Sequence, residues 1–234
     1  MKAMILAAGR GERLRPLTDR TPKPMLPVRG RPLLEHQLEW LAAAEIREVV
    51  INLHHLGHKI ESHLGSGESF GVTIQYSHES EVLETGGGIV NALPLLGSEP
   101  FLILNGDVFT DFPLEDLQGL PAWADFHLLV TPKPVFRDQG DFEVAEGRIT
   151  ARGDRYVYCG IALMRPGLFA NIPAAQFSLR DLFFKAIDAG RISAQIWPGY
   201  WIDIGNQAQL DSVNGRSTNS TTGAERPDTS GSDT

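Results

Sequence analysis

The chain has 234 residues, of which 42% are hydrophobic and 21% charged, a balance typical of a globular protein with a sizeable core. Its formal net charge of −8 argues against a general nucleic-acid-binding protein, because such proteins present a basic face to the phosphate backbone. No apolar run approaches the roughly 20 residues of a membrane span, and the run at the N-terminus is too short for a signal peptide. The single cysteine, Cys159, allows no internal disulfide and suits a reducing compartment. We therefore expect a cytoplasmic protein that is a monomer or a small homo-oligomer.

Strand and helix patterns alternate over residues 1–110. The predicted strands span residues 2–7, 48–52, 72–76 and 101–104, and the predicted helices span 33–44, 56–64 and 85–93. Residues 8–30 are rich in glycine, proline, arginine and lysine, so we expect a long functional loop there. The alternation predicts an α/β fold with a mostly parallel sheet. Ligands of such sheets bind beyond the carboxyl ends of the strands.

The second half of the sequence is less regular. Predicted strands span residues 126–131, 142–144, 156–164 and 192–197, and a predicted helix spans 179–189. From Ser212 onward almost no apolar residue occurs, so burial cannot offset the entropy of ordering. We therefore predict a single domain over residues 1–211 and a disordered tail over residues 212–234.

The strongest local motif follows the first strand and reads LAAGRGERLRPLT, followed by PKPMLPV. Gly9 and Gly11 allow backbone amides to approach phosphate oxygens closely, and arginine and lysine side chains supply positive charge. The motif is not a Walker loop, because Gly-Lys-Ser/Thr is absent, nor a dinucleotide fingerprint, because Leu14 stands where the third glycine is required. A glycine turn with surface arginines is the alternative without a ligand.

Two further motifs contain candidate ligand-binding groups. Asp107 follows an apolar strand at the expected ligand edge, and Asp203 follows another apolar segment. An isolated aspartate is often only a turn residue, but Mg²⁺ prefers few carboxylates together with phosphate oxygens and water, which two such aspartates would supply. Three glycines, residues 86–88, begin a predicted helix and could present amides to an anion or a flat ring.

These motifs, together with LETGGG, Asn105-Gly106-Asp107 and WIDIG, resemble the signature of the sugar-1-phosphate nucleotidyltransferases and occur in the family order up to about residue 210. The resemblance implies a Rossmann-like nucleotide-diphospho-sugar transferase fold. It further implies a nucleotide-binding half over residues 1–110 and an inserted sugar-binding half over residues 111–211. The implied partners are a nucleoside triphosphate and a sugar 1-phosphate.

The resemblance also implies roles for individual residues. The nucleotide would be bound by Ala8, Gly9, Gly11, Glu12, Arg13, Lys23, Ser80, Gly86 and Gly87, of which Lys23 and Arg13 would be catalytic. The sugar phosphate would be bound by Asn105, Gly140, Tyr158 and Gly160. A Mg²⁺ cofactor would be held by Asp107 and Asp203.

The sugar side departs from the family pattern. Many members carry a Glu-Lys pair whose lysine contacts the sugar phosphate, but here no lysine follows Phe142-Glu143-Val144. The sequence does not choose a replacement among its candidates, which are Arg152, Arg155 and Arg180. The histidines His54, His55 and His58 have no nearby acidic or cysteine partner, so we interpret them as surface or packing residues.

Several substrates stay open. The compact length and LETGGG most resemble the N-acetylmuramate 1-phosphate uridylyltransferases of cell-wall recycling, which use UTP. Mannose-1-phosphate guanylyltransferases and glucose-1-phosphate thymidylyl- or uridylyltransferases share much of the signature. A cytidylyltransferase for a cationic alcohol would need an aromatic cage, for which Tyr158 and Trp201 are candidates. An inactive nucleotide-sugar sensor is disfavoured, because such proteins tend to lose the loop arginine, the lysine or the aspartates, and all of these are present.

Overall fold

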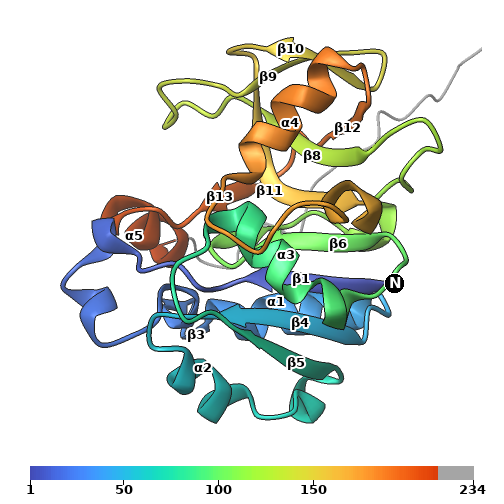
Figure 1. Ribbon diagram of the computed structural model, residues 1–234. Coiled ribbons are helices and arrows are strands. Elements are labelled where there is room, and N and C mark those ends of the chain that lie inside the picture. Colours follow the sequence, from blue (N-terminus) through green and yellow to red (C-terminus); the bar gives the residue numbers. More distant parts are fainter. Residues whose placement is uncertain (216–234) are drawn as a thin grey trace, which may run out of the picture.

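A nine-stranded sheet runs through residues 2–196 of the computed structural model, which describes residues 1–215 (Figure 1). Its strands are, in spatial order, β5 (Thr73–His78), β4 (Glu48–Leu53), β1 (Lys2–Leu6), β6 (Phe101–Asn105), β11 (Tyr156–Met164), β8 (Phe126–Pro132), β12 (Ile192–Ile196), β10 (Arg148–Arg152) and β9 (Phe142–Ala145). Two short pairs lie beside it, namely β7 (Val108–Thr110) with β13 (Trp201–Asp203), and β2 (Pro27–Val28) with β3 (Arg31–Pro32). The predicted α/β fold is confirmed.

Strand direction decides which loops meet at one edge of the sheet. The four strands β5, β4, β1 and β6 are parallel, with β1 between β4 and β6. Strand β11 is antiparallel to β6 and also to β8, so β8 points the same way as β6. The segments that follow β1, β4, β6 and β8 therefore all leave the sheet at the same edge. The second half of the chain thus extends the sheet of the first half.

Helices cover both faces of the sheet. They are α1 (Leu33–Ala43), α2 (Gly57–Leu64), α3 (Glu84–Leu96), α4 (Leu179–Asp188) and α5 (Gln207–Gly215). None of the helices within residues 1–215 has the length and apolar character needed to cross a bilayer.

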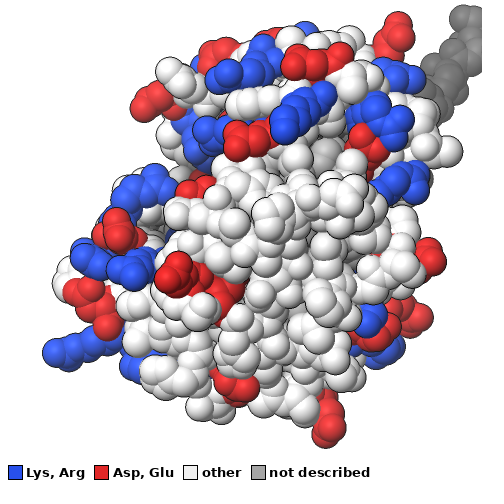
Figure 2. Space-filling model, in the orientation of Figure 1, with Lys and Arg blue, Asp and Glu red and all other residues white. Residues whose placement is uncertain are grey.

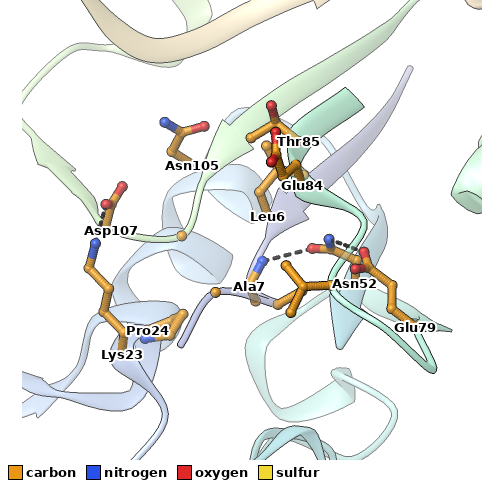
Figure 3. Close-up of a pocket in the computed structure, with 14 residues that line it drawn as sticks. Leu6, Ala7, Lys23, Pro24, Asn52, Glu79, Glu84, Thr85, Asn105 and Asp107 are labelled. Atoms are coloured by element: carbon orange, nitrogen blue, oxygen red, sulfur yellow. Dashed lines mark hydrogen bonds and ion pairs between the residues drawn. The ribbon is translucent and has the colours of Figure 1, made fainter. Parts of the chain in front are cut away.

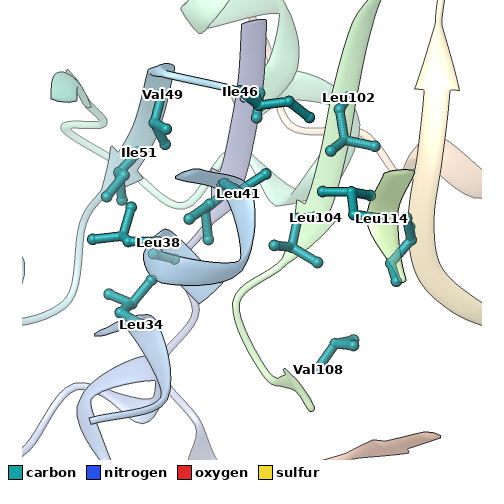
Figure 4. Packing of buried hydrophobic residues seen from close by; sticks show 14 of the residues in the cluster. Leu34, Leu38, Leu41, Ile46, Val49, Ile51, Leu102, Leu104, Val108 and Leu114 are labelled. Atoms are coloured by element: carbon teal, nitrogen blue, oxygen red, sulfur yellow. The ribbon is translucent and has the colours of Figure 1, made fainter. Parts of the chain in front are cut away.

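Alternating residues of β1 fill two different cores. Ala3 and Ile5 pack with α1 and α2, whereas Met4 packs with α3 and α4. This is the period-two alternation of a strand that is buried on both faces. On α1, residues at helical spacing face the sheet, as Figure 4 shows for Leu34, Leu38 and Leu41.

A third core joins the two ends of the described chain. Leu14 and Leu26, from the segment after β1, pack against Ile204, Leu210 and Val213 near the C-terminal helix α5. In Figure 1, α5 lies beside the dark-blue segment that follows β1. The Asn214 side chain adds two hydrogen bonds, accepting from the backbone N–H of residue 29 and donating to the carbonyl of residue 27. The helix thereby holds the glycine-rich segment against the rest of the protein.

This helix corrects the predicted start of the tail. We expected disorder from Ser212 onward, but α5 continues to Gly215 and Val213 is completely buried. The sequence of α5 is mostly polar because only one face of the helix is buried. Leu14 and Leu26, which pack on this face, lie about 200 positions earlier in the sequence. The remainder of the predicted tail, residues 216–234, lies outside the described residues.

We predict that Val213→Ala lowers the free energy of unfolding by about 2 kcal/mol, because a buried side chain leaves a cavity in the third core. Denaturant unfolding of the full chain measures this effect. The matched control is Ser212→Ala, one residue earlier on the exposed side, which should change the free energy by less than about 0.5 kcal/mol. Equal stability of the two variants would show that α5 does not pack as described.

Candidate active site

The site begins where β1 and β6 end side by side. Leu6 is paired in register with Asn105, and the Gly106 N–H donates to the Leu6 carbonyl at 3.0 Å. A Cβ at Gly106 would lie 2.6 Å from that carbonyl oxygen, so only glycine allows this close approach. The segments that follow β1 and β6 diverge at this point. Open α/β sheets bind ligands at such a position.

A cavity opens at this point of divergence (Figure 3). Its lining comes from the ends of β1, β4, β5 and β6, from the glycine-rich segment and from the start of α3. The lining residues are Leu6, Ala7, Ala8, Gly9, Lys23, Pro24, Asn52, Glu79, Val82, Glu84, Thr85, Asn105, Gly106 and Asp107. Of the residues predicted from the sequence, Ala8, Gly9, Lys23, Asn105 and Asp107 therefore meet here.

The glycine-rich segment is held from outside the cavity. Gly11 has a φ of 62°, and a Cβ there would lie 2.9 Å from the Thr18 side chain. The Thr18 hydroxyl donates to the Gly11 carbonyl at 2.9 Å, and the Thr18 carbonyl lies 3.0 Å from Nε2 of His55. Gly9 differs, because no atom lies within 4 Å of the position of its Cβ. Packing explains the glycine at position 11 but not at position 9, where the backbone is open to a ligand.

Lys23 forms an ion pair with Asp107 at the mouth of the cavity (Figure 3). Lys23 comes from a short helical turn after the glycine-rich segment, and Asp107 follows β6 directly. Both side chains are largely buried, with 16% and 24% exposed. The pair therefore places one positive and one negative charge beside the end of β1.

Asp203 lies next to Asp107 because β13 pairs with β7. In this pairing Asp203 is opposite Val108, and the Ile204 N–H donates to the Asp107 carbonyl at 2.8 Å. The carboxylate of Asp203 accepts from Nη2 of Arg137 at 2.5 Å and from Nε2 of Gln209 at 2.9 Å.

The environment of Asp203 disfavours its charged form. Burial raises the pKa of the Asp203 carboxyl above its usual value, and the negative charge of Asp107 adds to the rise. The positive charges of Arg137 and Lys23 partly offset it. Two neighbouring carboxylates, each beside its own cation, form an acidic pair that a divalent cation could neutralise further.

The donor set fits a magnesium ion. Within residues 1–215, no cluster of three or more histidine, cysteine or acidic side chains is placed to bind a metal. Two carboxylates alone leave most of an octahedral shell to phosphate oxygens and water, which is how Mg²⁺ is usually bound with a phosphate substrate. The cationic side chain of Arg13 lies near Gly205, two residues after Asp203. A Cβ placed on Gly205 would be 3.1 Å from Nη2 of Arg13. Glu12 is exposed on the adjoining turn.

A chain of buried polar groups that was not predicted from the sequence lies on the opposite side of the cavity (Figure 3). The Ala7 N–H donates to Oδ1 of Asn52 at 2.7 Å, and Nδ2 of Asn52 donates to Oε1 of Glu79 at 2.6 Å. The other oxygen of Glu79 accepts from the Leu83 N–H at 3.2 Å. The available signals were a polar residue, Asn52, near the end of the apolar strand β4 and an acidic residue, Glu79, directly after β5.

The glycine triplet at the start of α3 is explained by packing. The N–H groups of Gly86 and Gly87 both donate to the carbonyl of Phe177, at 3.0 and 3.4 Å. Neither glycine lines the cavity, and a Cβ on Gly86 would lie 2.2 Å from the Phe177 ring. A Cβ on Gly88 would lie 2.7 Å from Glu79. Base binding by Gly86 and Gly87 therefore stays a prediction, and in this conformation another group already accepts from both amides.

The remaining predicted nucleotide and sugar residues occupy different places. Ser80 is exposed beyond the cavity lining. Gly160, with a φ of 73°, packs against the Asn105 side chain, where a Cβ would be only 2.8 Å away. The Gly140 N–H donates to Asp154 at 2.6 Å, so this amide already has an acceptor. Tyr158 has a buried hydroxyl with no hydrogen-bond partner among the described residues, and burial raises its pKa.

Among the described residues, none of the three arginines left open by the sequence pairs with Asp203. Arg152 lies over the ring of Phe184 at 4.4 Å, and Arg155 over that of Tyr156 at 5.4 Å. Arg180 is exposed at the start of α4. The cation beside Asp203 is instead Arg137, in the segment between β8 and β9, where no sequence pattern pointed to it.

Charges are unevenly distributed over the face seen in Figure 2. Lys and Arg side chains gather along the left edge, where Figure 1 places the glycine-rich segment, and over the upper part that holds β9, β10 and α4. The central part of this face is mostly uncharged. Asp and Glu side chains lie among the basic side chains in both regions, so charges of both signs gather there.

Comparison with known proteins agrees with this geometry. The model of the nucleotidyl transferase family matches residues 2–125. An N-acetylmuramate alpha-1-phosphate uridylyltransferase from Neisseria meningitidis is 42% identical over 90% of this chain and 95% of its own length. A protein with the same name from Caulobacter vibrioides is 35% identical over 89% and 93%. A mannose-1-phosphate guanyltransferase beta-B from Xenopus laevis is 32% identical over 88% of this chain and 61% of its own length.

Solved structures share the fold at lower identity. A putative glucose-1-phosphate thymidylyltransferase from Bacillus anthracis superposes with a TM-score of 0.79 at 22% identity and covers 92% of this chain and 94% of its own. HddC from Yersinia pseudotuberculosis, complexed with GMP-PN, gives 0.78 at 21% and covers 91% and 97%. The nucleotide-diphospho-sugar transferase fold and the family resemblance are confirmed. The chain belongs to the nucleotidyl transferase family and is a nucleotidyltransferase.

Proposed function

We propose that this enzyme transfers the uridylyl group of UTP to N-acetylmuramate α-1-phosphate, with Mg²⁺ at Asp107 and Asp203, and that it serves peptidoglycan recycling. The observation that carries the proposal is the meeting of Lys23, Asp107 and Asp203 at the ends of β1 and β6. Similarity that extends over nearly the whole of this chain and of two N-acetylmuramate α-1-phosphate uridylyltransferases supports the choice of substrate.

A guanylyltransferase acting on mannose 1-phosphate is the second candidate. Mannose-1-phosphate guanyltransferases from Xenopus laevis, Danio rerio and Aspergillus oryzae are 31–33% identical to this chain, so the reaction class is shared. This chain, however, spans only 61% of their length. Coverage and identity together favour the uridylyltransferase. A glucose 1-phosphate substrate stays a further alternative, because a putative glucose-1-phosphate thymidylyltransferase has a similar fold.

The proposed reaction is an in-line displacement at the α-phosphorus of the triphosphate. An oxygen of the sugar phosphate forms a bond to this phosphorus, the bond to the bridging oxygen of the β-phosphate breaks, and pyrophosphate leaves. The attacking phosphate is already ionised at neutral pH, so no side chain has to remove a proton. Catalysis then depends on positioning and on neutralising charge.

The residues at the edge of the sheet divide these tasks. The open backbone at Gly9 accommodates phosphate oxygens, and Arg13 and Lys23 neutralise the charge on the triphosphate. Asn105 reaches the cavity from the end of β6, and its side chain lies against Gly160. In the proposed reaction, Asn105 contacts the sugar 1-phosphate. When bound at Asp107 and Asp203, magnesium would supply electrostatic stabilisation of the phosphate oxygens.

We predict that Asp107→Ala lowers kcat by at least about 1,000-fold, because one of two metal carboxylates and the partner of Lys23 are lost together. Pyrophosphate release at saturating substrate measures it. Asp188→Ala, an exposed aspartate at the end of α4, is the control and should retain full activity. Near-normal turnover by folded Asp107→Ala would disprove the metal assignment.

The substrate is tested by measuring pyrophosphate release for each pairing of four nucleoside triphosphates with several acceptors. The acceptors are the 1-phosphates of N-acetylmuramate, glucose, mannose and N-acetylglucosamine, together with phosphocholine. We expect UTP with N-acetylmuramate α-1-phosphate to give the highest kcat/KM, by at least about tenfold. A preference for GTP with mannose 1-phosphate would support the second candidate instead. No release from any pair in the presence of magnesium would favour an inactive sensor.

A further inference from the structure

Arg137 is the only basic residue that hydrogen-bonds to Asp203 among residues 1–215, and it reaches this residue from the sugar-binding half. Its Nη2 lies 2.5 Å from Oδ2 of Asp203. The Nε of Arg137 is buried and has no hydrogen-bond partner in the described part of the chain. A buried N–H without an acceptor costs free energy, so this guanidinium has unused donor capacity.

Two contacts hold the guanidinium in place. It lies over the ring of Trp201, with Cζ 5.6 Å from the ring centroid, and the adjacent Phe136 ring stacks on the same indole. Trp201 is itself fixed, because it is 5% exposed and its Nε1 donates to the Cys159 carbonyl at 2.8 Å. The cation–π contact and the ion pair together restrict the guanidinium to one side of Asp203.

The segment that contains Arg137 is anchored at both ends. Asp154 forms an ion pair with Lys133 and accepts from the Gly140 N–H at 2.6 Å. The segment follows β8, which points the same way as β6, so it emerges at the edge where the other ligand-binding segments emerge. Even so, 36% of the Arg137 side chain stays exposed, so a solute phosphate can reach it.

The two aspartates are thus neutralised from opposite halves of the protein. Lys23 from the nucleotide side pairs with Asp107, and Arg137 from the sugar side pairs with Asp203. A carboxylate oxygen that accepts from a guanidinium at 2.5 Å is less available to a cation. A divalent ion at Asp203 must therefore compete with Arg137, and its binding would free the guanidinium for another anion.

We propose that Arg137 binds the phosphate of the sugar 1-phosphate and that it exchanges Asp203 for this phosphate when the divalent cation binds. The proposal rests on the proposed function and adds the residue that contacts the sugar phosphate. A guanidinium can bind two phosphate oxygens at once, and Nη2, once released from Asp203, would supply one of the donors. Arg137 would occupy the role for which the family lysine is missing from this sequence.

The test compares Arg137→Gln and Arg137→Lys with Arg191→Gln in the full chain. Arg191 is a matched control, since it also pairs with an aspartate, Asp125, at 2.5 Å, but at the start of β8 and β12 on the opposite edge of the sheet. Two quantities are measured, namely the KM for each substrate and the affinity of the nucleotide-free protein for Mn²⁺, obtained from the paramagnetic resonance of free Mn²⁺.

The apparent affinities for the sugar 1-phosphate and for Mn²⁺ should change in opposite directions. Arg137→Gln should raise the KM for the sugar 1-phosphate about 10- to 100-fold, as expected for the loss of charge-assisted hydrogen bonds, and change the KM for UTP less than about threefold. The same variant should bind Mn²⁺ more tightly, because Asp203 has lost its competitor. A general loss of structure could not produce this tighter binding. Arg137→Lys should recover part of the sugar-phosphate affinity, and Arg191→Gln should match the wild type.

Two outcomes would overturn the assignment while leaving the proposed function intact. One is an active Arg137→Gln enzyme with an unchanged KM for the sugar 1-phosphate. The other is weaker Mn²⁺ binding by this variant, which would mean that Arg137 helps to hold the cation. A wild-type enzyme that turns over no sugar 1-phosphate would instead overturn the proposed function itself.

Discussion

The close pairing of β1 with β6 is the constraint on which the site depends. In the sheet, β4 lies on one side of β1 and β6 on the other. The segments that follow β1 and β6 therefore separate, and a cavity opens between them. The contact of Gly106 with the Leu6 carbonyl keeps the two strand ends together, so Asp107 emerges beside the start of the glycine-rich segment. Buried apolar residues on both faces of β1 fix its position and therefore that of the cavity.

The second organising feature is the neutralisation of two neighbouring carboxylates. Burial and the negative charge of Asp107 raise the pKa of Asp203, and each of the two carboxylates pairs with one cation from a different half of the protein. A site of this kind can exchange internal ion pairs for contacts with a cation and with phosphates, while the number of opposite charges in contact stays similar. The proposed exchange would limit the electrostatic cost of binding a highly charged substrate.

Local patterns predicted the parts of this protein whose partners lie nearby in the sequence. The strands around Ile5, Ile51 and Ile103 and the helix containing Leu38 are apparent from periodicity, because burial imposes it. Strand β10 was missed, since only one of its five residues is buried, and so was α5, whose covering residues come from the opposite end of the chain. The motif residues Lys23 and Asp107 form an ion pair, and their roles in nucleotide and metal binding stay predictions. Arg137 could not be predicted, because its position follows from strand directions and from the placement of Trp201.

The packing of α5 on the glycine-rich segment has a consequence for synthesis. A ribosome makes the chain at about 5–20 residues per second, so Leu14 leaves it roughly ten or more seconds before Val213 does. During this interval β1 can pair with β4 and later with β6, but the glycine-rich segment lacks the surface that holds it. The glycine-rich segment therefore reaches its final packing only after residues about 200 positions later have been made. In a nascent chain the glycine-rich segment is not completely packed until helix α5 has emerged.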